Sequence, residues 1–389
     1  MIRLAVPSID EDDLTAVRQT LASGQLVQGR RVAAFEEAIA EYVGTEYAVA
    51  VNSCTSALLL ALMALDVGPG DRVGVTTYSW PATANVIALC GAEPVFIEIA
   101  SETFNIDPAA LEETLNRTTL KAIIPVHTFG AMADMQGVFA AAESRGVPVV
   151  EDAACALGAR QGPKSAGTFG IMGCFSFHPR KAITTGEGGV ITTDDDALVR
   201  RLRMLRNHGQ DPDALVPDFI MPGFNMRLTE AQAALGLTQL NKVERIIEKR
   251  RRLAAHYNEL LGGGRLSPPR ELKGTRHVYQ SYVALLPREA AARRASIIVA
   301  LAKRGIEATI GTYHMPLTTY FREHGGFRTG DFPVTDDTAA RAISLPMSES
   351  LTPEQQVRVV SALEELVKTD DLSDQEDNAS RLGQQCERA

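Results

Sequence analysis

Short runs of β-branched residues alternate with longer runs of helical character from residue 47 onward. The runs that predict strands are residues 47–52, 72–78, 94–99, 122–127, 148–151, 174–177 and 189–193, and those that predict helices are 55–65, 81–89 and 135–145. This alternation is typical of a mainly parallel sheet wrapped by helices. Because residues 55–65 are apolar on all faces, we expect that helix to be buried. The pattern predicts an α/β fold.

The pattern changes near residue 229. A long helical stretch at 229–261 carries the basic run Lys249-Arg250-Arg251-Arg252, which we interpret as a solvated helix face opposite several Glu residues. Three glycines follow, and the strand and helices expected after them, at 279–285, 290–304 and 353–367, are enough for a small α+β domain. We predict a large domain over residues 1–245 that includes the N-terminal segment, a smaller C-terminal α+β domain over 246–368, and a disordered polar tail over 369–389.

Composition narrows the class of protein. The 389 residues are 45% hydrophobic and 22% charged, as in an ordinary soluble globular protein. A formal net charge of -9 argues against nucleic acid or an anionic membrane as partner. The sequence shows no signal-peptide core, no apolar run that spans a bilayer and no CxxC pair among its five cysteines. We therefore predict a cytoplasmic protein with free thiols.

Lys181 is the first candidate for chemistry. It follows an apolar strand and precedes the Gly-rich turn Gly186-Glu187-Gly188-Gly189. A lysine amine forms a Schiff base with a carbonyl compound, and pyridoxal phosphate enzymes are built on that bond. Because burial makes a lysine amine neutral enough to act as a nucleophile, this setting indicates more than a surface charge.

Polar residues also stand at the ends of predicted strands. Thr55 and Ser56 open the helix at 55–65, where free amides and the helix dipole favour a phosphate, although a plain N-cap is the commoner explanation. Asp152 follows the strand at 148–151 and is placed to keep a pyridinium nitrogen protonated, or equally to cap a helix. There is no GxxxxGK[ST] motif, and no GxGxxG follows a strand. A phosphate site here would be neither a P-loop nor a Rossmann site.

Three ring side chains fall at strand ends as well. Trp80, the only tryptophan, is placed to stack on a cofactor ring, or else to pack in the core. His127 and His178 are more often hydrogen-bonded scaffolding than catalysts at such positions. No set of His, Cys and Asp residues has the spacing of metal ligands, so we predict no metal site.

Taken together and in order, these stretches resemble the DegT-type (DegT/StrS) aminotransferases of sugar and aminocyclitol biosynthesis, which have the aspartate-aminotransferase (fold type I) architecture. The resemblance covers roughly residues 5–365. It rests on Ser23-Gly24-Gln25-Leu26-Val27-Gln28-Gly29, residues 52–58, Thr83-Ala84, Pro125-Val126-His127 with Gly130 and Ala133-Asp134-Met135, Glu151-Asp152-Ala153-Ala154, residues 176–181 with Gly186-Glu187-Gly188-Gly189, and Gly223-Phe224-Asn225-Met226-Arg227-Leu228-Thr229-Glu230.

The resemblance implies a cofactor, pyridoxal 5'-phosphate, with pyridoxamine phosphate as its intermediate form. Lys181 matches the lysine that carries the cofactor and later moves a proton between the substrate and cofactor carbons. Asp152 matches the partner of the pyridine nitrogen, and Trp80 falls at the ring-stacking position. The phosphate would be held by residues matching Thr55, Ser56 and Ser176.

The resemblance also implies a homodimer with shared active sites, because Asn225 matches a residue that reaches the phosphate of the neighbouring subunit's cofactor. Arg227 would meet a carboxylate or phosphate of the substrate, and His178, Tyr313 and His314 are the other candidates for substrate contact. Cys155 departs from the pattern, since many relatives have Gln or His there to contact the ring hydroxyl. The segment 310–316 matches the substrate loop only loosely, so the sugar remains unnamed.

The resemblance therefore predicts a ping-pong transamination. L-Glu or L-Gln would give its amino group to the cofactor, and the loaded cofactor would aminate a keto-sugar, commonly a nucleotide-linked one. One alternative is a keto-cyclitol acceptor. Another is a sugar dehydratase of the same fold, against which Lys181 argues because that branch replaces the lysine, often by His. A non-catalytic sensor is a third, but the sequence has no helix-turn-helix signal and no basic patch.

Overall fold

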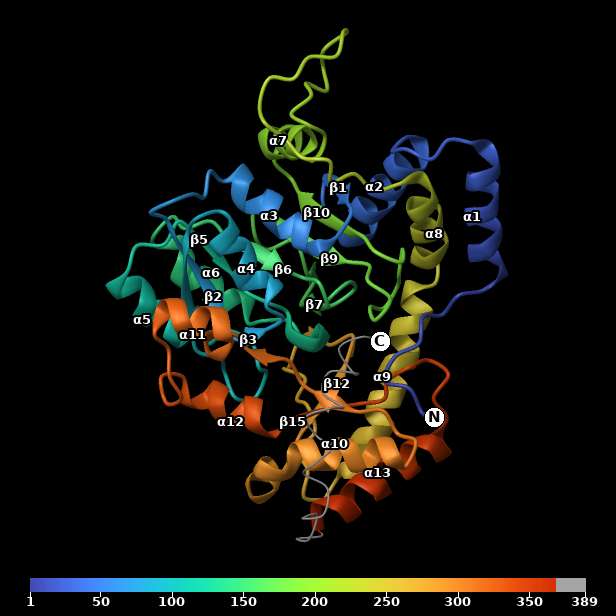
Figure 1. Ribbon diagram of the computed structural model, residues 1–389, viewed down its shortest axis with the longest axis vertical. Coiled ribbons are helices and arrows are strands. Elements are labelled where there is room, and N and C mark those ends of the chain that lie inside the picture. Colours follow the sequence, from blue (N-terminus) through green and yellow to red (C-terminus); the bar gives the residue numbers. More distant parts are fainter. Residues whose placement is uncertain (369–389) are drawn as a thin grey trace.

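The computed structural model describes residues 1–368, and the predicted tail at 369–389 lies outside the described residues. Within them, one large sheet crosses the molecule (Figure 1). Its strands are, in order, β1 (Tyr47–Val51), β10 (Gly189–Thr193), β9 (Met172–Ser176), β6 (Val150–Asp152), β5 (Ala122–Ile124), β2 (Arg72–Thr76) and β4 (Glu93–Ile97). Isolated bridges that pair Ile123 with Val149 and Val126 with Asp152 join β5 to β6. β10 runs antiparallel to both neighbours and the other pairs are parallel, so the predicted mainly parallel sheet is confirmed.

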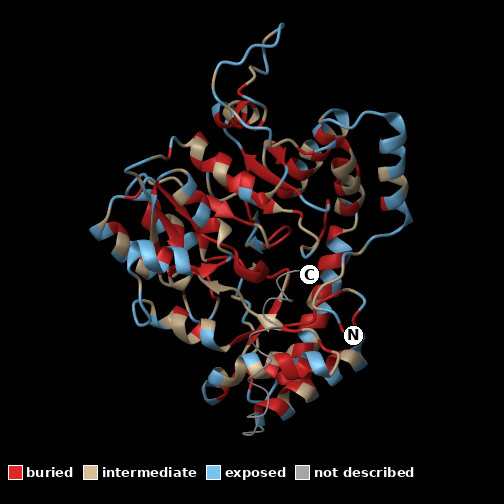
Figure 2. Cartoon of the chain, in the orientation of Figure 1, coloured by how far each residue is buried: buried red, intermediate tan, exposed pale blue. Residues whose placement is uncertain are grey.

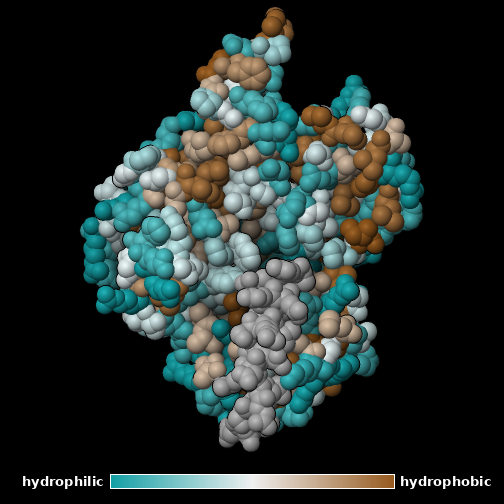
Figure 3. All heavy atoms as spheres, viewed as in Figure 1, coloured by the Kyte–Doolittle hydropathy of each residue, from teal (hydrophilic) through white to brown (hydrophobic). Residues whose placement is uncertain are grey.

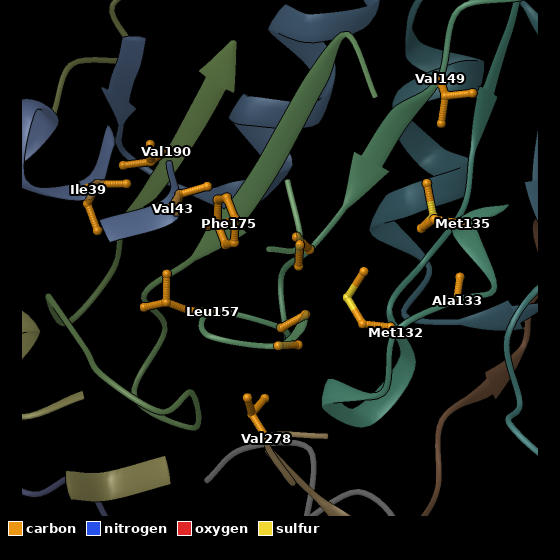
Figure 4. Close-up of a cluster of buried hydrophobic side chains, with 14 of the residues drawn as sticks. Ile39, Val43, Met132, Ala133, Met135, Val149, Leu157, Phe175, Val190 and Val278 are labelled. Atoms are coloured by element: carbon orange, nitrogen blue, oxygen red, sulfur yellow. The ribbon is translucent and has the colours of Figure 1, made fainter. Parts of the chain in front are cut away.

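Helices cover both faces of this sheet. Successive residues of each strand point to opposite sides, and the apolar side chains on both sides are buried in two cores. The helices on one face are α3 (Cys54–Ala64), α4 (Ala82–Leu89) and α7 (Asp196–Arg206). Those on the other face are α2 (Arg30–Val43), α5 (Pro108–Arg117), α6 (Met135–Glu143) and α8 (Glu230–Leu240). Figure 4 shows Phe175 and Val190 of adjacent strands within the second of these cores. As predicted, α3 is buried along most of its length (Figure 2).

The N-terminal helices were missed by the sequence analysis. α1 (Glu11–Ser23) packs against α8, and α2 packs against both α8 and the sheet. The long helix expected at 229–261 is two helices, because α8 ends at Leu240 and α9 begins at Val243 (Val243–Leu261). Asn241 and Lys242 form a turn between them, and Nζ of Lys242 lies 2.8 Å from Oδ2 of Asp13.

A smaller α+β unit follows, as predicted. Its antiparallel sheet has the order β12 (Tyr282–Leu285), β15 (Ala342–Leu345) and β13 (Thr309–Ile310). α10 (Arg294–Lys303), α13 (Pro353–Lys368) and the second half of α9 pack on it. The helix predicted at 290–304 begins as a 3₁₀ turn at Arg288–Arg293 before α10.

α9 crosses the predicted domain boundary between residues 245 and 246. Val243 and Ile246 near its start belong to the core of the large sheet, whereas Tyr257 and Leu261 belong to the smaller core. The N-terminal segment, which was expected with the large domain, also pairs with the smaller unit, since Ile2 forms a parallel bridge with Ile306. The boundary itself stays a prediction.

Several short elements and one projecting loop lie outside these two units. β14 (Tyr313–His314) pairs with β3 (Tyr78–Ser79) in a two-stranded sheet, so the segment 309–314 runs from the small sheet to the residues that follow β2. Other elements are α11 (Thr319–Gly325), α12 (Pro333–Arg341), two 3₁₀ turns at Thr128–Gly130 and Met315–Leu317, and a small sheet of β11 (Thr275–Arg276), β7 (Arg160–Gln161) and β8 (Lys164–Ser165). The loop 208–224, which we call the arm, projects beyond α7 at the top of Figure 1. No helix among residues 1–368 is long and apolar enough to cross a membrane.

Candidate active site

Lys181 lies on an irregular loop between β9 and β10. Its backbone N–H donates to the carbonyl of His178 at 2.9 Å, and its Nζ donates to Sγ of Cys155 at 3.0 Å. Burial lowers the pKa of this amine, but Cys155, Cys54 and Asp152 outweigh burial and hold the pKa above its usual value. The sequence analysis expected burial to make the amine neutral, whereas these neighbours favour the ammonium form.

Asp152 ends β6 and is 4% exposed. Thr83 Oγ1 donates to its Oδ2 at 2.7 Å, and the N–H of Ala154 donates to its Oδ1 at 3.1 Å. Burial raises the pKa of Asp152, against the opposing effects of Thr83, Ala154 and Lys181. A turn rather than a helix follows β6, so Asp152 is not the helix N-cap that local sequence also allowed. It is a fixed, buried carboxylate within electrostatic reach of Lys181.

His127 and Glu151 form a buried pair next to Asp152. The sequence analysis did not single out Glu151 as a site residue. The side chains of His127 and Glu151 are fully buried, with Nε2 and Oε2 2.8 Å apart. Because the N–H of Ala133 donates to Nδ1 of His127 at 3.1 Å, Nε2 carries the proton and donates to Glu151. Glu151 also accepts three backbone N–H groups of the loop 167–170 at 2.7 to 2.8 Å. His127 is therefore scaffolding that fixes the strand ends beside Asp152.

The start of α3 has the features of an anion site. Ser53 is the N-cap, since its Oγ accepts the N–H of Ser56 at 3.1 Å. Ser56 Oγ donates to Oδ1 of Asn52 at 2.6 Å, and Thr55 is exposed at this end. The N-cap is thus Ser53 rather than Thr55 or Ser56, and a phosphate site at these two residues stays a prediction. The free amides and the dipole of α3 are left to attract an anion.

Gly189 brings β10 into contact with this helix start. It pairs with Val51 on one side and with Ser176 on the other. A Cβ at this position would lie 2.5 Å from the carbonyl group of Ser53 and 2.6 Å from the nitrogen of Cys54, so only glycine fits. Ser176, at the end of β9, is thereby one strand away from the start of α3.

Trp80 follows β3 and is 63% exposed. Its ring meets that of Tyr313 edge to face, with centroids 5.4 Å apart, because the pairing of β14 with β3 sets Tyr313 opposite Ser79. Neighbouring residues of a strand point to opposite sides. His314 accordingly points away from Tyr313 and is buried, with Nε2 3.1 Å from Oδ1 of Asp336. The structure unites Trp80 and Tyr313, and it gives no support to a substrate contact by His314.

The other predicted site residues lie at strand ends near the arm or on the Lys181 loop. His178 is half-buried and its Nδ1 accepts the N–H of Arg180 at 3.2 Å, while burial lowers the pKa of the imidazole. Arg227 forms a bridge with Val51, and so lies at the strand end from which α3 starts. Asn225 is exposed at the base of the arm.

These groups fit pyridoxal phosphate. Its aldehyde, pyridine nitrogen and phosphate call for an amine, a buried carboxylate and a helix N-terminus, which Lys181, Asp152 and α3 supply around one end of the sheet. Among residues 1–368, no group of three or more His, Cys, Asp and Glu residues is arranged to hold a metal ion.

Known proteins share this architecture. Residues 7–364 match the model of the DegT/DnrJ/EryC1/StrS aminotransferase family. GDP-perosamine synthase of Caulobacter vibrioides is 36% identical over 369 residues, which cover 94% of this chain and 98% of that protein. The putative sugar aminotransferase Spr1654 of Streptococcus pneumoniae, solved in PLP and PMP forms, superposes in its PMP form with a TM-score of 0.90 at 28% identity over 95% of this chain and 99% of that one. Helicobacter pylori PseC, an aminotransferase of pseudoaminic acid biosynthesis, gives 0.89 at 30% identity over 94% and 99%.

Proposed function

This chain belongs to the DegT/DnrJ/EryC1/StrS aminotransferase family, and we propose that it transfers an amino group from L-glutamate or L-glutamine to a nucleotide-linked keto-sugar in a ping-pong reaction. It is an aminotransferase that depends on pyridoxal phosphate. The names of its relatives support a sugar as acceptor, and the name GDP-perosamine synthase supports one that is linked to a nucleotide.

Pyridoxal phosphate supplies an aldehyde carbon that takes up the amino group and a ring that withdraws electrons from it. We assign Lys181 to bind that carbon and, once released, to carry the proton to and from it. Because Cys155 and Asp152 raise the pKa of the free amine, the amine holds a proton that it can give. Asp152 would face the ring nitrogen, where a cationic partner offsets the cost of burying its charge.

The remaining residues would hold and orient the cofactor and substrates. The start of α3, with Thr55 and Ser56, and the hydroxyl of Ser176 are suited to the phosphate. Trp80 offers an aromatic plane for the ring, and its contact with Tyr313 limits the positions that the indole can take. For the anionic groups of the substrates, Arg227 and His178 are the donors that we propose.

Exposed apolar residues support the proposed homodimer. Leu215, Val216, Phe219 and Ile220 are 50% exposed or more on the arm, and hydrophobic residues cap its tip in Figure 3. Isolated apolar side chains are ordinary at a surface, but a projecting loop rich in them marks an interface. With Asn225 at its base, the arm would carry that amide toward the cofactor of a second copy. Free cysteines in the described residues support the proposed cytoplasmic location, since thiols persist in reducing compartments.

The observation that carries this proposal is the amine of Lys181 beside Cys155 and within electrostatic reach of Asp152. The test is the visible absorption of the protein loaded with pyridoxal phosphate, before and after L-Glu and then L-Gln, with Lys181→Ala in parallel. We expect a band that one donor bleaches, and no such band in Lys181→Ala.

The acceptor half of the reaction is tested separately. After the donor has been washed away, addition of a nucleotide-linked keto-sugar should return the band and yield an amino sugar in amounts equal to the enzyme. Loss of water from the sugar without amine formation would assign the protein to dehydration instead. Turnover retained in Lys181→Ala would sink the assignment altogether.

A further inference from the structure

Arg250 is buried, although it belongs to the basic run expected to face solvent. Its side chain is 3% exposed, and its Nε lies 3.0 Å from Oε1 of Glu349. Nη1 donates to the carbonyl of Gln280 at 3.0 Å, and Nη2 donates to the carbonyl of Lys181 at 3.4 Å. One guanidinium thus joins α9 and two segments of the smaller unit to the main chain of the candidate catalytic lysine.

A second side chain holds the neighbouring peptide group. Nε2 of Gln280 donates to the carbonyl of Arg180 at 2.9 Å. The loop at 180–181 belongs to no helix or strand, so sheet pairing does not fix its carbonyl groups. Two successive carbonyls of the loop are therefore fixed from outside, one by Arg250 and one by Gln280.

Unusual backbone conformations gather where the segment 278–281 crosses the large domain. Tyr279 has φ 47° and Phe129 has φ 58°, both in a region that side chains disfavour. Gly130 accepts the N–H of Val278 at 3.0 Å, and a Cβ on Gly130 would lie 3.1 Å from the carbonyl oxygen of Cys155. Strain of this kind persists only where the surroundings enforce it, and it concentrates at functional sites.

We propose that Arg250 is a positioning residue, which fixes the main chain at Lys181 so that the lysine amine returns to one place each time it is released from the cofactor. This inference rests on the proposed function for the role of Lys181. It assigns to the smaller unit, through Glu349 and Gln280, a share in setting the geometry of that amine.

The chemistry requires arginine at this position. A guanidinium presents five N–H donors in a rigid plane and reaches three acceptors in different directions at once. A lysine in its place keeps the charge beside Glu349 but cannot span the same three groups. Arg250→Lys therefore loosens the loop without leaving a buried carboxylate unpaired.

Arg206 supplies a matched control. It is 4% exposed, pairs with Glu36, and donates to the carbonyl of Ala50 at 2.8 Å, so it is also a buried arginine with one carboxylate and one main-chain partner. None of those partners belongs to the Lys181 loop. Arg206→Lys should cost comparable stability and leave Lys181 unaffected.

The experiment compares wild type, Arg250→Lys, Glu349→Gln and Arg206→Lys in three measurements. These are kcat and KM, the pH midpoint of the visible band of the loaded protein, and hydrogen exchange of peptides covering residues 178–188. In Arg250→Lys we expect kcat to fall about 10- to 100-fold with KM within about 3-fold, because small misplacements of a reacting group cost rates of this order. We also expect a shifted midpoint and faster exchange, with smaller changes in Glu349→Gln.

The outcomes separate this inference from the proposed function. Equal loss of thermal stability in Arg250→Lys and Arg206→Lys, with kcat, midpoint and exchange unchanged in both, would show that Arg250 is only structural. Should Arg250→Lys fail to fold, Glu349→Gln and Gln280→Ala decide by the same measurements. Should the wild type fail to bind pyridoxal phosphate, the proposed function falls. Hydrogen exchange at 178–188 in Arg250→Lys and Arg206→Lys still shows whether Arg250 fixes the main chain at Lys181.

Discussion

Asp152 carries a carboxylate where water does not reach it. Because burial raises the pKa of Asp152, its carboxyl group binds a proton more tightly in the folded protein than in the unfolded chain. A carboxyl group shifted in this direction favours the folded state at acid pH, and that advantage is lost as the pH rises through the raised pKa. At neutral pH the cofactor-free protein therefore bears a cost at the site, which is the usual sign of a residue kept for function.

Asp152→Asn should make the cofactor-free protein more stable at pH 8. Asparagine removes the buried charge and can still accept the N–H of Ala154, so we expect Tm to rise by about 2–4 °C. Below about pH 4, where the unfolded carboxyl is protonated as well, the difference should vanish. Thermal unfolding at both pH values checks this, with the exposed Asp12→Asn as control. A lower Tm for Asp152→Asn at pH 8 would contradict this prediction. The same variant should also lose turnover, by about 100-fold or more.

Among the neighbours that raise the pKa of Lys181, Cys155 contributes most. Since burial alone lowers the pKa of the amine and Cys155 opposes burial, Cys155→Ala should lower that pKa. The measurement is the pH dependence of labelling of Lys181 by an amine-directed reagent in cofactor-free protein. Cys90→Ala is the control, because burial alone raises the pKa of that thiol. Identical pH profiles for both variants would refute the assigned role of Cys155.

At the scale of elements, α2 begins without a cap of its own. Its N-cap is Gly29, which has no side chain to offer. Glu230 of α8 fills the place, since its carboxylate accepts the N–H groups of Gly29, Arg31 and Val32 at 2.9 to 3.0 Å. A buried negative charge at a helix N-terminus is stabilised by the helix dipole. One residue thus caps α2 and fixes it to α8.

Glu230→Gln should therefore destabilise the protein without altering its spectrum. The loss of charge at the start of α2 is expected to cost about 1–2 kcal/mol in the free energy of unfolding. Urea denaturation measures this, and Glu37→Gln on the exposed face of α2 serves as control. Equal midpoints for the two variants would show that the cap contributes nothing.

The sheet was predictable because its strands are apolar runs bounded by turns. α2 left a signal that was overlooked, since Val32, Phe35, Ile39 and Val43 recur at helical spacing and are all buried. Arg250 left one too, because it occupies the apolar stripe of α9 between Ile247 and Leu253. No local pattern could show which group Arg250 binds, because the carbonyl of Lys181 lies some 70 positions earlier in the chain. Such contacts depend on tertiary packing.

At the scale of the whole molecule, the arm is expected to decide assembly. Phe219→Asp with Ile220→Asp places two charges on its apolar surface, where their burial in an interface is unfavourable. We expect the variant to sediment as a monomer and to lose at least about 90% of its activity if the amide of Asn225 is needed in trans. As a control, Asp in place of Glu323 of α11 and of Arg328, both exposed and away from the arm in Figure 1, should alter neither property.

Shared active sites make a sharper prediction. Lys181→Ala and Asn225→Ala homodimers should both be nearly inactive, but mixed dimers contain one site with neither defect. Unfolding and refolding the two variants together should then restore about one quarter of wild-type activity, since half of the dimers are mixed and each has one intact site. Activity that stays at the level of the separate variants would argue for independent sites.

Residues near the start of the chain are bound to residues that are made some 300 positions later. The N–H of Leu4 donates to Glu307 at 2.8 Å, and its carbonyl accepts the N–H of Met347 at 2.9 Å. During translation at about 5–20 residues per second, this first segment waits roughly 15–60 s for its partners. The large sheet has all its strands by residue 193, so it can form during that wait. The contacts of Leu4 therefore form only after residue 347 has been made, well after the strands of the large sheet.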